Sequence, residues 1–292
     1  MICINNFIDK QLQTWNLAAD NYRNLATVRR REIVVDGAHF VLQFNPSRIR
    51  STAAKITANE VALRPCFLCP QNRPSEQMVE QWRNYSILVN PYPIFGKHLT
   101  IVSQKHERQE VLKYLDDMAQ LAVEMPQMAI FFNGSECGAS APDHRHFQAG
   151  SIDEWPLFAD YKKFSKVIFE SNKYILSESD ETFRKIYKYY TIDLNNINEI
   201  KESIEQKLKE YKRDESMLNI ITTYSKDENA INMYVVIRKA FRPSQYYADS
   251  CEKILISPAS AEVGGILITP REEDFQKITT EDIKSIFSQV CF

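Results

Sequence analysis

Glycine and histidine are scarce in this sequence, and the few residues of each kind gather in one place. Of seven glycines and five histidines in 292 residues, three glycines and two histidines lie between Gly134 and Gly150. An excess of positive charge is also missing, because 36 lysine and arginine residues are balanced by 38 aspartate and glutamate residues. This balance excludes the broad basic face that nucleic-acid binding requires, so small-molecule partners are favoured.

Long apolar runs and a secretory signal are absent as well. No stretch of about 18 apolar residues occurs that could span a membrane. The first residues carry acidic and polar side chains where a signal peptide has a basic end and an apolar core. The six cysteines are too few and too dispersed for a disulfide scaffold in a chain of this length. These absences predict a cytoplasmic protein without a membrane segment.

Hydrophobic periodicity predicts a mixture of helices and strands. An amphipathic helix is expected over 5–28, a tight hairpin around Asp36-Gly37, and two strands within 85–106 followed by a helix over 107–124. The run MAIFFN predicts a strand that enters the glycine-containing segment. Beyond Trp155 we expect a helix over 195–213, strands at 217–225, 230–239, 253–258 and 264–270, and one or two helices over 272–290.

The segment DHRHFQ (143–148) ends the glycine-containing run. In an extended strand alternate side chains share a face, so His144, His146 and Gln148 are expected to point together. A histidine can attack phosphorus when one ring nitrogen is unprotonated and the other is held by a hydrogen bond. We therefore predict His146 as a nucleophile and Gln148 as a catalytic donor to a phosphoryl oxygen. An isolated His-x-His pair is, however, more often a strand whose histidines bond to each other or to a carbonyl.

The loop NGSECGAS (133–140) precedes this motif. Its glycines permit close approach of the backbone to a ligand, and Ser135 and Ser140 offer hydroxyl donors. Backbone amides and hydroxyls of this kind suit an anionic phosphate. The loop and the histidines together predict a pocket that handles phosphate.

Cys66 and Cys69 form the one closely spaced cysteine pair. Two thiolates at this spacing can bind one tetrahedral metal ion from a turn, and zinc accepts histidine nitrogens as further ligands. Of His98, His106 and His144, we prefer the last two, because His106 follows a strand and lies in a polar turn. The predicted metal site is Cys66, Cys69, His106 and His144. On spacing alone, reduced core cysteines with a surface His106 are equally well supported.

Three segments carry a resemblance to a known family: CFLC (66–69), NPYPIFGKHLTIVSQKH (90–106) and NGSECGASAPDHRHFQ (133–148). In this order they resemble the histidine-triad superfamily, and within it the transferase branch of galactose-1-phosphate uridylyltransferase, diadenosine tetraphosphate phosphorylase and the GDP-hexose phosphorylases. The resemblance implies an α+β fold of two halves, each an antiparallel sheet with flanking helices, here 1–160 and 161–292. The second half, with Arg238, Arg242 and Glu262, is expected to close the substrate pocket.

The resemblance also implies roles for single residues. In that branch the second histidine of the His-x-His-x-Gln motif becomes nucleotidylated, and this position is His146. Gln148 stands where the hydrolases of the superfamily carry a third histidine, which implies a transferase or phosphorylase. In uridylyltransferases of the bacterial type, two cysteines and two histidines hold zinc, and they resemble Cys66, Cys69, His106 and His144. We expect this zinc to be structural, because protein would fill all four of its positions. The expected phosphate-binding residues are Asn133, Ser135, Gly138, Ser140 and Arg145.

The resulting hypothesis is a nucleotidyltransferase or phosphorylase with a covalent nucleotidyl-histidine intermediate. Its substrate is expected to be a nucleotide sugar or a dinucleoside polyphosphate, and its acceptor inorganic phosphate or a sugar phosphate. Two alternatives stay open: a histidine-triad nucleotide hydrolase, against which Gln148 argues, and a decayed nucleotide-binding protein, against which the intact histidines argue. A homodimer is an expected assembly. No motif identifies the base or the sugar.

Overall fold

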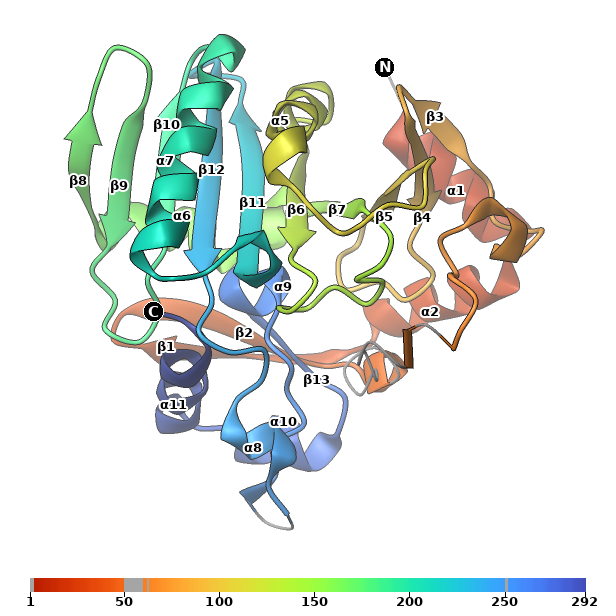
Figure 1. Cartoon of the computed structure of the whole chain (residues 1–292). Helices are drawn as coiled ribbons and strands as arrows, with labels where there is room; N and C mark the ends of the chain where they lie inside the picture. Colours follow the sequence, from red (N-terminus) through yellow and green to blue (C-terminus); the bar gives the residue numbers. More distant parts are fainter. Residues whose placement is uncertain (1–2, 50–59, 62, 250–251) are drawn as a thin grey trace.

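The computed structural model of the chain describes residues 3–49, 60–61, 63–249 and 252–292 (Figure 1). Within these residues, a ten-stranded antiparallel sheet runs through the molecule in the order β3-β4-β5-β7-β6-β11-β12-β10-β9-β8. The strands in this order are β3 (Glu80–Trp82), β4 (Tyr85–Val89), β5 (His98–Ser103), β7 (His146–Ser151), β6 (Met128–Asn133), β11 (Leu218–Ser225), β12 (Ala230–Ile237), β10 (Tyr187–Thr191), β9 (Ile175–Ser179) and β8 (Ser165–Glu170).

A smaller sheet of three described strands lies against one face of the large sheet. Its hairpin, β1 (Arg29–Val35) and β2 (Ala38–Phe44), confirms the turn predicted at Asp36-Gly37. Both turn residues have positive φ angles, 50° and 89°, as a two-residue turn of this handedness requires. The third strand, β13 (Ile266–Thr269), pairs with β2 in parallel, so the chain returns from its last third to its N-terminal hairpin.

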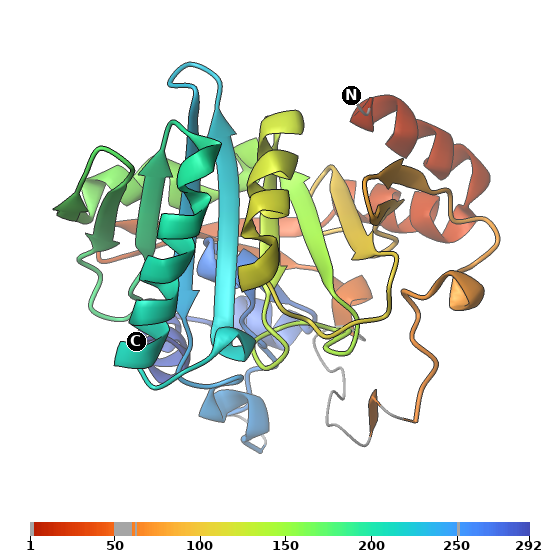
Figure 2. The ribbon, with the colours of Figure 1, turned by 45° about the horizontal axis from the view of Figure 1, so that its top comes forward.

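The helices cover both faces of the large sheet (Figure 2). On one face α5 and α7 pack over an apolar cluster, and on the other the small sheet, α9 and α11 enclose a second cluster. Strands β6 and β12 are buried along their whole length, which explains their unbroken apolar runs. The helices are α1 (Ile4–Thr14), α2 (Asn16–Ala26), α5 (Leu115–Glu124), α6 (Pro156–Asp160), α7 (Ile197–Glu210), α8 (Ser244–Tyr247), α9 (Ser260–Val263), α10 (Glu272–Lys277) and α11 (Thr280–Val290).

Three predicted elements differ from the structure. The helix expected over 5–28 is two helices, because Trp15 between them is extended, with φ −132° and ψ 98°. The helix expected from residue 107 begins with a single 3-10 turn at Leu112 and becomes α-helical at Leu115. The run 253–258 is not a strand: Ile254 donates its backbone N–H to the Gln245 carbonyl, and the next residue donates to a carboxylate, so no strand ladder forms.

The α+β fold with a large antiparallel sheet is confirmed, whereas the small sheet is mixed, because β13 pairs with β2 in parallel. Strands from both predicted halves join in one sheet, since β6 pairs with β11. The division at residue 160 therefore remains a prediction. In the described ranges, none of the helices has the length and hydropathy needed to cross a membrane.

Candidate active site

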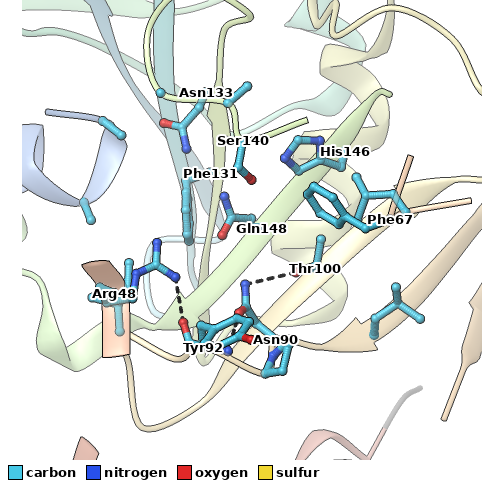
Figure 3. Close-up of a pocket in the computed structure, with 18 of the residues that line it drawn as sticks. Arg48, Phe67, Asn90, Tyr92, Thr100, Phe131, Asn133, Ser140, His146 and Gln148 are labelled. Carbon is cyan, nitrogen blue, oxygen red and sulfur yellow. Dashed lines mark hydrogen bonds between the residues drawn. The ribbon is translucent and has the colours of Figure 1, made fainter. Parts of the chain in front are cut away.

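Strand β7 positions the predicted nucleophile. It lies between β5 and β6, and its alternating side chains separate two environments. Phe147 packs into the apolar cluster under α5, while His146 and Gln148 line a cavity of about 610 Å³ on the opposite face (Figure 3). His144 precedes the strand and turns toward the cysteines. The expectation that all three share one face is therefore correct for two of them.

The ring of His146 is held in one tautomer. Its Nδ1 lies 2.8 Å from the backbone oxygen of His144, and a carbonyl can only accept, so Nδ1 carries the proton. The other ring nitrogen, Nε2, keeps its lone pair. Burial lowers the pKa of His146 to about 4, so the ring is uncharged near neutral pH. This geometry leaves Nε2 available as a nucleophile.

Gln109 anchors the backbone at this point, a role that the sequence did not reveal. Its Oε1 accepts the backbone N–H of His146 at 2.8 Å. Its amide nitrogen donates to the carbonyls of Asn133 and His146 at 2.9 and 3.0 Å. The side chain is buried and joins the ends of β6 and β7, so it ties the histidine to the loop that follows Asn133. No periodic or motif signal marks a glutamine at this position.

The amide of Gln148 is oriented by His98. The backbone N–H of Ile94 donates to Nδ1 of His98 at 3.2 Å, so the proton of this ring lies on Nε2. That N–H donates to Oε1 of Gln148 at 2.9 Å, which leaves the NH₂ group of Gln148 for the cavity. Burial lowers the pKa of His98 to about 3, so the ring stays neutral. His98 is thus a positioning residue for Gln148.

For the nucleotidyl transfer that the sequence predicts at His146, replacement of His98 by phenylalanine is expected to lower the rate by about 10- to 100-fold, because the Gln148 amide loses the donor that sets its orientation. The phenyl ring preserves most of the buried volume. The rate of adduct formation on His146 measures the effect. His39→Ala is the matched control, since His39 is exposed on β2. An unchanged rate in His98→Phe would show that Gln148 needs no such support.

The loop before the motif brings three of its predicted residues to the cavity: Asn133, Gly138 and Ser140. Oδ1 of Asn133 accepts from Asn219 and from the backbone of Ser260, so its NH₂ group is turned to the cavity. Gly138 has a φ of +115°, and a Cβ there would lie 2.4 Å from the Cβ of Ala259. Only glycine fits this position.

Ser135 and Arg145 are not among the residues that line the cavity. Arg145 is buried on the other side of the strand, where it pairs with Glu107, donates to Ser103 Oγ at 3.2 Å, and stacks 3.4 Å from the centroid of the Tyr114 ring. The prediction that Arg145 binds phosphate is therefore not supported. The reason is the alternation of the motif, since odd-numbered residues face away from His146.

Arg145→Met is expected to lower the free energy of unfolding by roughly 2–3 kcal/mol, because the ion pair with Glu107 and the buried hydrogen bonds of the guanidinium are lost, and Glu107 keeps only the hydrogen bonds from Ser103 and Tyr114. Chemical denaturation measures this difference. The matched control is Arg23→Met, which removes an exposed pair with Asp20 and is expected to change stability by less than about 0.5 kcal/mol. Equal midpoints for the two variants would contradict the role assigned to Arg145.

The predicted metal ligands meet at one point beside the cavity. Sγ of Cys66 lies 3.3 Å from Nδ1 of His144, and Sγ of Cys69 lies 3.5 Å from the same atom and 3.2 Å from Nδ1 of His106. The four donor atoms are within 4.8 Å of one another and could hold a metal ion. Nε2 of His144 lies 2.8 Å from the Ser103 carbonyl, so the lone pair of His144 is on Nδ1, toward the thiols.

Further charged residues line the cavity from segments distant in sequence. Glu262 and Arg242 of the second half are present, as expected, and Arg48 and Arg64 join them. The sequence did not reveal these last two, because they lie in irregular polar stretches. Arg238 is instead fully buried, where it donates to the carbonyls of Val290 and Pro258. Its predicted place in the pocket wall is not what the structure shows.

Comparisons with known proteins agree with this architecture. A family model described as "Domain of unknown function (DUF4922)" matches residues 7–151. No curated protein matches the chain in sequence. The crystal structure of yeast Ap4A phosphorylase Apa2 is similar, with a TM-score of 0.62 and 13% identity over 95% of this chain and 96% of that chain. The crystal structure of its complex with Ap4A gives a TM-score of 0.62 and 15% identity, and the match covers 100% of this chain and 99% of that chain.

At this level of identity the likeness shows the fold. The chain has the α+β fold of Apa2, which agrees with the fold that the three sequence segments predicted. Apa2 matches this chain over nearly its whole length, and its structure in complex with AMP gives a TM-score of 0.61 and 14% identity over 97% of this chain and 94% of that chain.

Proposed function

We propose that this chain is a nucleotidyltransferase or phosphorylase that acts on a dinucleoside polyphosphate or a nucleotide sugar through a nucleotidyl-His146 intermediate. The observation that carries the proposal is the state of His146. Its Nδ1–H is bonded to the His144 carbonyl, and its unprotonated Nε2 belongs to a ring that lines a cavity with the Gln148 amide. This arrangement suits attack on phosphorus.

The first step forms a bond between Nε2 of His146 and the α-phosphorus. The bond between that phosphorus and the bridging oxygen breaks, and the electron pair leaves with the oxygen of the departing group. Because Nδ1 keeps its proton, the ring becomes a cation, which the His144 carbonyl stabilises. In the second step an oxygen of inorganic phosphate or of a sugar phosphate attacks the same phosphorus, and Nε2 recovers its lone pair.

Gln148 favours transfer over hydrolysis. Its amide can donate a hydrogen bond to a phosphoryl oxygen, but it has no titratable proton to give to a leaving group or to take from water. The amides of Asn133 and Gln148 and the hydroxyl of Ser140 are the side-chain donors available to the charge that develops on the phosphoryl oxygens. A departing phosphate needs no added proton, because it is a stable anion.

We further propose that the metal ion is zinc and that its role is structural. Two sulfur and two nitrogen donors suit zinc, and at tetrahedral angles its bond lengths put S and N about 3.6 Å apart, close to the separations found here. Burial raises the pKa of the Cys66 thiol to about 11, so a cation is needed to hold the thiolate. All four positions are filled by protein, and the ligand His144 carries the carbonyl that holds His146.

The fold likeness to a phosphorylase whose structures are described as complexes with Ap4A and AMP supports the substrate class. The test is incubation of the purified chain with dinucleoside polyphosphates and nucleotide sugars in the absence of an acceptor. Intact-protein mass spectrometry is expected to show the mass of one nucleotidyl group, and added phosphate is expected to release it as a nucleoside diphosphate. Continuous turnover in water without an acceptor would instead indicate a hydrolase, and ligand binding with neither adduct nor turnover a decayed site.

A further inference from the structure

Arg64 lies two residues before the first cysteine of the metal site and lines the same cavity as His146. Two contacts fix its guanidinium group. Nη2 donates to the backbone oxygen of Ser140 at 2.7 Å, and the group stacks 5.0 Å from the centroid of the Phe67 ring. The side chain therefore joins the cysteine turn, which carries Phe67, to the loop that precedes the His-x-His motif.

The guanidinium of Arg64 has an unused donor. Its Nε is buried and has no hydrogen-bond partner in the part of the chain that the structure describes, where it also forms no ion pair. A buried N–H without an acceptor is unfavourable, so an acceptor from a ligand would be stabilising. Arg48, the arginine near Gln148, also has a buried Nε without a partner among the described residues, but it differs in that the carboxylate of Glu262 acts on its charge.

The position of the Arg64 charge matters for the chemistry. In Figure 3 Ser140 and Phe67, the two contacts of Arg64, lie beside His146, whereas Arg48 lies on the far side of Gln148. The charge of Arg64 is thus on the side of the cavity where His146 would meet phosphorus. Phosphoryl oxygens are the acceptors that a planar guanidinium fits best, through paired N–H donors.

We infer that Arg64 is a phosphate-binding catalytic residue of this cavity, which donates from Nε to a non-bridging oxygen of the phosphoryl group that His146 attacks. The inference rests on the proposed function. The amides of Gln148 and Asn133 are neutral donors, so Arg64 supplies the full positive charge near the reacting phosphorus. Its contact with Phe67 makes its orientation depend on the turn that holds Cys66 and Cys69.

Binding of inorganic pyrophosphate tests the inference without any turnover. Calorimetric titration of the metal-loaded protein is expected to show affinity at least about 10-fold weaker in Arg64→Met than in wild type. The matched control is Arg31→Met, because Arg31 also donates to backbone carbonyls, of Phe275 and Ile278, but does not line the cavity. Equal affinity in wild type and Arg64→Met, or no binding of pyrophosphate to the wild type, would overturn the inference.

The rate of adduct formation on His146 gives the second readout. Arg64→Met is expected to lower the maximal rate by about 100-fold, with Arg64→Lys restoring binding better than rate, because a lysine keeps the charge but not the planar donors. A metal content and a Tm equal to those of the wild type would exclude a folding defect in the two Arg64 variants. An adduct formed at the wild-type rate in Arg64→Met would overturn the role of Arg64 and leave the proposed function intact. Binding of pyrophosphate through Arg64 in a wild type that forms no adduct would contradict the proposed function and the catalytic role of Arg64. Arg64 would then be a phosphate-binding residue only.

Discussion

His146→Ala is expected to abolish the covalent adduct and to lower the rate of nucleotidyl transfer by at least about 10⁴-fold. The ring supplies the only protein atom that bonds to phosphorus in the proposed mechanism. Because His146 is held by the His144 carbonyl and not by a carboxylate, its removal leaves no buried charge behind. We therefore expect the folded structure to be retained, with a change in Tm of a few degrees at most.

The control for this prediction is His39→Ala, which removes an exposed histidine on β2 and is expected to leave the rate unchanged. A second variant, His146→Gly, opens space for free imidazole. Addition of imidazole is expected to restore part of the transfer, because the small molecule can carry the nucleotidyl group in place of the side chain. Adduct formation that persists in His146→Ala would place the nucleophile elsewhere.

Loss of one cysteine ligand is the other change with a large expected effect. Cys66→Ser is expected to abolish metal binding at the proposed zinc site and to lower Tm by roughly 10 °C, since metal binding contributes directly to folding stability. Adduct formation is expected to fall as well, because His144 is both a ligand and the residue whose carbonyl holds His146. Elemental analysis and differential scanning calorimetry measure the two effects.

Cys3→Ser is the matched control for the metal site, since Cys3 is an exposed free cysteine outside it. It is expected to keep one metal ion per chain and the wild-type Tm. A chelator applied to the wild type is expected to reproduce the Tm of Cys66→Ser. A wild type purified without metal, with a Tm equal to that of Cys66→Ser, would contradict the site.

The local signals in the sequence were strong wherever a short segment determines its own structure. The Asp36-Gly37 turn was predictable because two successive positive φ angles favour few residue types. The helix over Ile197–Glu210 and the buried strand β6 followed from periodicity and from an unbroken apolar run. The break at Trp15 was not predictable, because helical spacing continues through it, whereas in the structure Trp15 is extended, buried and lines the cavity.

By itself the sequence determined the residue types of the site: two cysteines at metal-binding spacing, a His-x-His-x-Gln motif, and a glycine-containing loop. Their spacing along one strand also placed His146 and Gln148 on the same face, because that alternation is local. The directions in which His144 and Arg145 turn depend on long-range packing, since the cysteines and Glu107 that they contact come from other segments. The tertiary structure likewise brought Arg48 and Arg64 to the cavity through long-range packing, which no periodicity or short motif encodes.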